Sequence, residues 1–447
     1  MICFQCFISK YLKSRAKLSK KNRSNGFFFE NISYFCIVKH FKKVFKILLC
    51  GIIMLTISGI TPIMAQNEPQ VPSSTEVKEI DPMDSIEVSL LICSPHEEIY
   101  SLYGHAAIRW HDLRKHHTGE SERDWVFNWG MFSFSKPYFV LRFLFGLTDY
   151  ELACYDYSHF WPYYQKWGSS ITEQVLNLTN AEKRRLDAAL RENLRPENKV
   201  YRYNFFYDNC STRPRDVIEA CVEGQVQYMD REEYNPTYRE MVRECVRNHA
   251  WARFGNDMLL GIKADFKTNR AEQEFLPLNL LQDMATAQIY ANGEYRPLVK
   301  EQRSPLPPGV QLIEPDFLLT PTQVAILLLM LSVGIMWIEW RRKKTFKFWD
   351  MLLMTIQGLT GCILTVMLFS QHPTTTLNLN VLLFNPLPLL FLPAVFKRKA
   401  DRWWIIQFVM LVLFAIGAFF QSYAEGMGFL ALSLLLRIIS NKRGQLF

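Results

Sequence analysis

The 447-residue sequence contains none of the short motifs typical of nucleotide- or cofactor-dependent proteins. It has no Walker A loop and no glycine-rich dinucleotide fingerprint, and its histidines and cysteines show no metal-ligand spacing. It also has no nucleic-acid-binding module, and its formal net charge of +8 is modest. We therefore expect no cofactor, no metal and no nucleic-acid partner, so any chemistry should rest on side chains alone.

Charged residues are scarce, at 21% of the chain, and they are nearly missing from long stretches of its C-terminal third. Most of the apolar runs there have the ~20 residues that a helix needs to cross a bilayer. We expect an all-α transmembrane bundle of five helices within residues 317–440. The five runs are residues 317–340, 351–370, 379–396, 403–423 and 426–439.

Lysine and arginine are absent from two connections between these runs, residues 371–378 and 423–428. By contrast, basic clusters stand at 341–344, 397–399 and 442–443. Cytoplasmic loops of membrane proteins carry the excess of lysine and arginine. Placing the clusters inside and the two other loops outside satisfies this rule at every turn. Five crossings then put the preceding globular part outside, on the periplasmic side of the inner (cytoplasmic) membrane.

The N-terminal part has the three-part layout of a secretory signal. Residues 39–46 are basic, residues 47–55 are apolar, and cleavage is plausible after the small residue Ala65. We assign residues 1–65 to an N-terminal arm and signal peptide, with an uncleaved membrane anchor as the alternative. Residues 66–84 are polar at first, with two prolines, and are expected to form a linker.

Five of the ten cysteines fall in the globular middle of the chain, and this odd number leaves at least one thiol unpaired. Cys210 is our candidate for a reactive thiol, because a polar turn precedes it and a helix is expected from about Thr212. The positive end of a helix dipole lowers a thiol pKa, and free N–H groups there stabilise an oxyanion. The alternative is that Cys210 is a small buried side chain.

Three strands are predicted early in the globular part, over residues 86–92, 103–110 and 124–129, from alternating or continuous apolar patterns. Antiparallel pairing of the last two across their long loop would bring Asn128 close to His105. His105 is the preferred general base because it stands on a strand, unlike the other histidines of the globular part. Asn128 would orient its imidazole, although a surface amide is the alternative.

A capping box marks one helix and a proline-rich stretch marks the end of the globular part. Thr179 followed by Glu182 predicts a helix beginning near residue 179. We therefore place the globular domain over residues 85–303 and a stiff linker over residues 304–316.

The pairing of Gly104-His105-Ala106-Ala107-Ile108 with a later Asn209-Cys210 resembles the circularly permuted papain-like group. This group includes the lecithin–retinol acyltransferases and the NlpC/P60-related cell-wall peptidases. The resemblance implies an α+β fold in which Cys210 is the nucleophile, His105 the base and Asn128 the third polar residue. It also implies supporting or oxyanion-binding roles near the thiol. Those roles fall to Asn209, Ser211, Asp208, Tyr207, Arg213 and Tyr103.

More closely, residues 89–215 look like the periplasmic domain of the Lnb family, the lipoprotein N-acyltransferases of Bacteroides-type bacteria. The C-terminal multi-pass region is similar to that family too. The resemblance implies transfer of an acyl chain from a membrane phospholipid, through a cysteine thioester, to the α-amine of a diacylated lipoprotein. The segments that carry it are residues 102–105, 126–128, 193–198 and 206–216.

Three other functions are compatible with the same motifs. A peptidoglycan-directed cysteine peptidase or amidase would use the same scaffold, although such an enzyme would not need five membrane spans as an anchor. A phospholipase would differ only in passing the acyl group to water. A non-catalytic envelope receptor or scaffold would not need Cys210 at all.

Overall fold

The computed structural model describes residues 81–114, 123–132, 137–229, 231, 233–311 and 316–443. The signal segment and most of the linker expected before residue 85 lie outside the described residues, as does most of the loop that precedes the third predicted strand.

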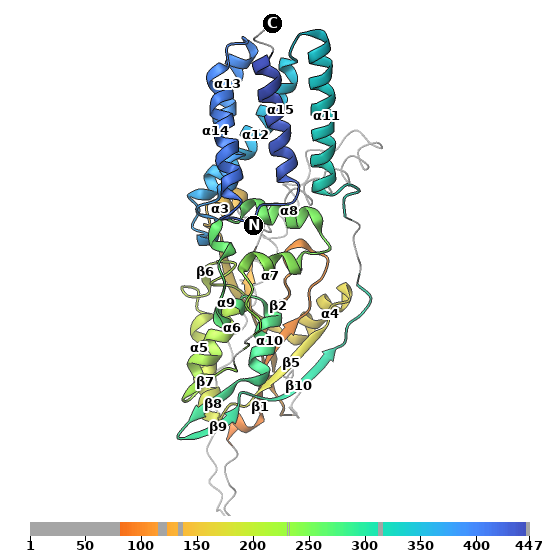
Figure 1. Ribbon diagram of the computed structural model, residues 1–447. Helices are drawn as coiled ribbons and strands as arrows, with labels where there is room; N and C mark the ends of the chain where they lie inside the picture. Colours follow the sequence, from red (N-terminus) through yellow and green to blue (C-terminus); the bar gives the residue numbers. More distant parts are fainter. Residues whose placement is uncertain are drawn as a thin grey trace, which may run out of the picture. The chain divides into compact units, whose positions relative to one another are not determined.

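A seven-stranded antiparallel sheet forms the centre of the globular domain, in the order β10-β5-β1-β2-β3-β4-β6 (Figure 1). The three predicted strands are all present and pair side by side as β1, β2 and β3. The second begins two residues later than predicted, after Gly104, which has a φ of +78°. The strands are β1 (Ile86–Cys93), β2 (His105–Asp112), β3 (Asp124–Met131), β4 (Asp149–Asp156), β5 (Ile171–Leu176), β6 (Val200–Arg202) and β10 (Val299–Leu306).

Helices cover both faces of this sheet because alternate strand residues are apolar on each side. On one face, Ile108 and Phe127 pack in a core with α5 (Asn180–Asn193), α6 (Thr212–Cys221) and α10 (Pro277–Thr286). On the other, Ala107 and Val126 pack with α4 (Tyr157–Trp167). Complete burial of a side chain such as Ile108 contributes about 1.5–3 kcal/mol.

The predicted capping box is confirmed: Thr179 and Glu182 bond reciprocally at the start of α5. The predicted boundary at residue 303 is wrong, because β10 continues to Leu306, which pairs with Ile171. Pro305 is tolerated there because β10 lies at the edge of the sheet.

Smaller elements complete the globular domain, including a second sheet in the order β7-β8-β9. They are η1 (Pro82–Ser85), η2 (Ile99–Ser101), α3 (Phe139–Leu144), β7 (Gln225–Gln227), α7 (Tyr238–Cys245), α8 (Ala250–Leu259), η3 (Ile262–Asp265), α9 (Arg270–Gln273), β8 (Gln288–Ala291) and β9 (Glu294–Pro297).

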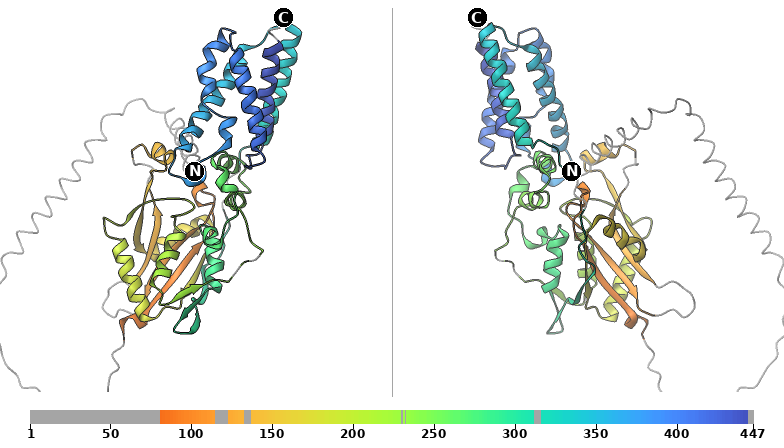
Figure 2. Two further views of the ribbon diagram at one scale, coloured as in Figure 1. Left: turned by 60° about the vertical axis from the view of Figure 1, so that its left-hand side comes forward. Right: turned by 90° about the vertical axis from the view of Figure 1, so that its right-hand side faces the viewer.

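The C-terminal region is helical, and its helices run alongside one another (Figure 2). By length and composition, three helices can cross a membrane: Pro321–Arg342, Lys347–Leu368 and Leu379–Phe396. The last of these contains a 3₁₀ turn before its α-helical part, whereas the two final helices have 17 residues each. The elements are α11 (Pro321–Arg342), α12 (Lys347–Leu368), η4 (Pro373–Thr375), η5 (Leu379–Leu382), α13 (Leu387–Phe396), α14 (Asp401–Gly417) and α15 (Met427–Arg443).

A buried ionic network joins three of these helices. Arg437 of α15 donates to Glu339 of α11 through Nη1 (2.8 Å) and Nη2 (2.7 Å), and to Asp350 of α12 through Nε (2.7 Å). All three side chains are buried. Charged groups among apolar helices persist only when they are paired, so this network fixes how α11, α12 and α15 associate.

The opposite ends of the helices contact the globular domain. Asn378 donates to the carbonyl of Met258 at 2.8 Å, and Gln421 donates to the carbonyl of Leu260 at 3.3 Å. Arg243 of α7 donates to the carbonyl of Tyr423 at 3.1 Å. The two connections without lysine or arginine therefore both lie on the globular side of the helices.

Candidate active site

Cys210 lies two residues before Thr212, the first residue of α6, on a turn that is held by its neighbour Asn209. The Asn209 Oδ1 atom accepts from the backbone N–H groups of Ser211 (2.7 Å) and Thr212 (3.0 Å). The backbone N–H of Asn209 donates in return to the hydroxyl of Thr212 at 2.9 Å. These local bonds fix the direction of the chain as it enters the helix, and so fix the position of the thiol.

His105 is the first residue of β2, and its Nε2 atom lies 2.6 Å from Oδ1 of Asn128 on β3. This is the approach that antiparallel pairing of the two strands predicted. Behind it, Nδ2 of Asn128 donates to the hydroxyl of Tyr155 at 2.5 Å, which identifies Oδ1 as the acceptor toward His105. Nε2 therefore carries hydrogen, and Nδ1 is left for the thiol.

The pKa values of Cys210 and His105 move in the directions that favour an ion pair. Burial opposes the thiolate, but the charge and hydrogen bond of His105, together with backbone N–H groups of Ala106 and Cys210, lower the pKa of Cys210. Burial likewise opposes the imidazolium, but the charge and hydrogen bond of Cys210 and the bond to Asn128 raise the pKa of His105. Both shifts therefore favour a thiolate beside an imidazolium.

The other cysteines of the described globular domain behave in the opposite way. All are free thiols, as Cys210 is. Burial raises the pKa of Cys93 and of Cys221, that of Cys154 to about 11 and that of Cys245 to about 12. Within this domain, a lowered thiol pKa is thus specific to the cysteine beside a histidine.

Two glycines allow the backbone to pass close to this pair. Gly130 has a φ of +90°, and a Cβ atom there would lie 3.4 Å from Cβ of Cys210. Gly104, with a φ of +78°, would place a Cβ atom 2.9 Å from the carbonyl oxygen of Cys93. A side chain at Gly104 would combine backbone strain with crowding, and one at Gly130 would combine backbone strain with a contact to Cys210.

The expected supporting residues build the surroundings of the site. In the described structure, no hydrogen bond joins the side chains of Asn209, Ser211, Asp208, Tyr207, Arg213 or Tyr103 to Cys210 or His105. Ser211 donates to the carbonyl of Glu274 at 2.7 Å. Tyr103 accepts from Asn256 of α8 at 2.7 Å.

Two further members of that set form an ion pair beside the turn. Arg213 donates to Asp208 at 2.5 Å and lies over the ring of Tyr201 at 3.6 Å. Tyr207 is 44% exposed and contacts the ring of Tyr238. The expectation that several N–H groups at the helix entrance hold an oxyanion is also corrected. Those of Ser211 and Thr212 are occupied by Asn209, as described above.

Tyr155 belongs to this site although the sequence did not indicate it. It lies on β4, opposite Val126 of β3, and reaches Asn128 from there. The sequence signal that could have pointed to Tyr155 is the alternation over residues 149–156, which predicts a strand able to pair with β3. Among the described residues, no group of three or more His, Cys, Asp or Glu side chains could hold a metal ion.

The fold and this site together define a membrane protein in which a mixed α/β domain, with a large antiparallel sheet and a thiol–imidazole pair, precedes a helical membrane domain. Residues 74–244 match the family model of the Lnb N-terminal periplasmic domain, and residues 313–445 match that of the Lnb transmembrane domain. The chain belongs to the Lnb family, and its globular part is the periplasmic domain. No curated protein and no solved structure matches it.

Proposed function

We propose that the protein is a cysteine-dependent lipoprotein N-acyltransferase with Cys210 as its nucleophile. Membership of the Lnb family supports an acyltransferase of this type. The observation that carries the proposal is the line of contacts from Tyr155 through Asn128 to His105, together with the lowered pKa of the Cys210 thiol.

In the first step, the Cys210 thiolate attacks an ester carbonyl of a membrane phospholipid. The N–H of Cys210 stabilises the oxyanion that forms. The carbon–oxygen bond of the ester then breaks, and the imidazolium of His105 gives its proton to the leaving oxygen. A lysophospholipid departs, and the acyl chain remains on Cys210 as a thioester.

In the second step, the free α-amine of a diacylglyceryl-cysteine at a lipoprotein N-terminus attacks the thioester. Neutral His105 accepts the proton that the amine loses, the carbon–sulfur bond breaks, and the thiolate returns. The product is an amide-linked acyl chain on the lipoprotein. The hydrogen bond from Nε2 to Asn128 keeps the imidazole in one orientation through both proton transfers.

The membrane region supports lipid substrates. Both the acyl donor and the lipoprotein acceptor are held in a bilayer, so a domain fixed to the same bilayer searches for them in two dimensions. The loops described above contact the globular domain directly through α7, α8 and the segment that follows α8. On the predicted topology, these contacts hold the site at the periplasmic surface of the inner membrane.

Mass spectrometry of lipoprotein N-termini tests this function. Cells depleted of the protein would be complemented with wild type, Cys210→Ala or Cys154→Ala, the last being a free thiol outside the site. We expect the amide-linked acyl chain to be lost on depletion and restored by wild type and Cys154→Ala, but not by Cys210→Ala. An unchanged N-terminus in depleted cells that lack another such enzyme would contradict the proposal and direct attention to cell-wall substrates.

A further inference from the structure

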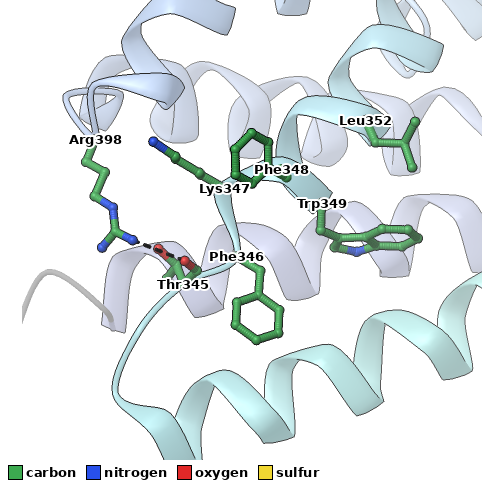
Figure 3. Close-up of a pocket in the computed structure, with 7 residues that line it drawn as sticks. All are labelled: Thr345, Phe346, Lys347, Phe348, Trp349, Leu352 and Arg398. Carbon is green, nitrogen blue, oxygen red and sulfur yellow. Dashed lines mark hydrogen bonds between the residues drawn. The ribbon is translucent and has the colours of Figure 1, made fainter.

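A pocket of about 490 Å³ lies between the start of α12 and the end of α13, at the ends of the helices remote from the globular domain (Figure 3). Phe346, Phe348, Trp349 and Leu352 give it a mainly apolar lining. Phe348 is 71% exposed, so the apolar surface opens outward from the helices. An apolar pocket in this position is suited to hydrocarbon.

Two cations stand at one side of this pocket, Lys347 and Arg398 (Figure 3). Arg398 donates to the carbonyl of Thr345 at 3.3 Å, and Lys347 donates to the carbonyl of Phe396 at 3.4 Å. Within the part of the chain that the structure describes, neither forms an ion pair with a carboxylate. Both retain donors for an anion, and each is anchored by a backbone carbonyl of the neighbouring segment.

The backbone conformation at Arg398 directs a positive charge to the same place. Arg398 has a φ of +55°, a conformation that favours glycine, just beyond the end of α13. An arginine held in this conformation projects its guanidinium to the pocket, where a glycine would relieve the strain but supply no charge.

The indole ring of Trp349 also lines the pocket. The indole Nε1 of Trp349 is buried and, among the described residues, has no acceptor. Indole rings gather where a bilayer meets water because they combine an apolar body with a polar tip.

We propose that this pocket binds one anionic phospholipid of the leaflet opposite the periplasmic domain. Its phosphate lies between Lys347 and Arg398, and one acyl chain lies against Phe348 and Leu352. This site is separate from Cys210 and takes a lipid as a bound ligand, not as an acyl donor. The surrounding basic residues of 341–344 and 397–399 attract anionic headgroups in general, whereas the pocket selects a whole lipid molecule.

Native mass spectrometry of the full chain in detergent tests this site with three probes: dioleoylphosphatidylglycerol, dioleoylphosphatidylcholine and inorganic phosphate. We expect one tightly bound phosphatidylglycerol. The Lys347→Gln/Arg398→Gln variant should weaken this binding about tenfold or more. The control Arg342→Gln/Lys344→Gln removes the same amount of charge from the same end of the helices, but at residues outside the pocket lining. It should weaken phosphatidylglycerol binding less than about threefold.

Three results would overturn the proposal: equal weakening by the two double variants, equal binding of phosphatidylcholine, or displacement of the lipid by inorganic phosphate at similar concentration. The first would indicate general surface attraction, the second ordinary boundary lipid, and the third a simple anion site. Lys347→Arg/Arg398→Lys keeps both charges and should retain binding, which separates loss of charge from loss of folding. None of these outcomes depends on acyl transfer.

Discussion

The hydroxyl of Tyr155 lies 2.5 Å from Nδ2 of Asn128, on the side of the amide away from His105. The third member of the proposed site is thus held from behind by a fourth residue on the next strand. Because the amide can present only one oxygen, fixing its nitrogen to Tyr155 fixes its oxygen toward the imidazole.

Replacement of Asn128 by alanine should slow acyl transfer on the order of ten- to hundredfold without abolishing it. The imidazolium would lose a hydrogen bond, and a bond to a charged group contributes roughly 1.5–3 kcal/mol. Single-turnover acylation of the purified full chain with a phospholipid donor measures the effect. An unchanged rate would remove Asn128 from the site.

Replacement of Tyr155 by phenylalanine should have a smaller effect, a reduction of about tenfold or less, because only a neutral bond is lost. The matched control is Tyr228→Phe, which removes a hydroxyl that bonds to Glu219 elsewhere in the same domain. Both variants should have similar thermal stability, and only Tyr155→Phe should slow acylation. Equal rates for the two would show that Tyr155 has no positioning role.

The pH dependence of Cys210 alkylation reports the ion pair directly. In the wild type, iodoacetamide should react with Cys210 well below the ordinary thiol pKa of 9.0, because the pKa is lowered. In His105→Gln the Cys210 thiol stays buried but loses the positive charge of the imidazolium. The pH at which Cys210 reacts with iodoacetamide should therefore rise above that value. Cys154, with a pKa of about 11, serves as internal reference in every sample. If Cys210 shows the same dependence of alkylation on pH in the two proteins, an ion pair between Cys210 and His105 is excluded.

The same shifts give the pH limits of catalysis. The rate should rise as pH passes the lowered pKa of Cys210 and fall as pH passes the raised pKa of His105. Asn128→Ala removes a contribution that raises the pKa of His105, so its upper limit should move to lower pH. A profile of acylation rate against pH for wild type and variant measures this. Movement to higher pH would contradict the assigned hydrogen bond.

Gly130→Ala should reduce acylation strongly because it adds both backbone strain and a methyl group against Cys210. A left-handed conformation costs a residue with a side chain about 1–2 kcal/mol. Gly293→Ala is the control, since Gly293 has a φ of +85° with nothing within 4 Å of an added Cβ. Both variants should lose similar stability in thermal unfolding, and only Gly130→Ala should lose activity. If both are equally active, Gly130 does not border the reacting thiol.

Arg437→Met should destabilise the helical domain by about 3–5 kcal/mol, because it leaves Glu339 and Asp350 buried without a partner. Thermal unfolding of the full chain in detergent measures the loss. The triple variant Glu339→Gln/Asp350→Asn/Arg437→Met should recover most of it, since no charge then remains buried. Equal destabilisation by the single and triple variants would show that packing, not charge, holds the three helices together.

Much of the candidate site is local in character, and local patterns predicted it. The short apolar segments in residues 103–110 and 124–129 indicate two strands, and pairing across one loop brings His105 to Asn128. The start of α6 could also be predicted from the sequence, because Pro214 is tolerated only in a first helical turn. Periodicity reports which residues are buried, however, and not which distant residue they meet.

By itself, the sequence determined the central strands, the start of α6, the apolar helices and the basic ends that separate them, since each follows from spacing and composition within one segment. Only the tertiary structure decided that β10 joins the sheet, that Tyr155 holds Asn128, and that Lys347 and Arg398 line one pocket. Each of these relationships depends on how whole elements pack against one another. The reactivity of Cys210 is of the same kind, because its pKa depends on a histidine carried by another strand.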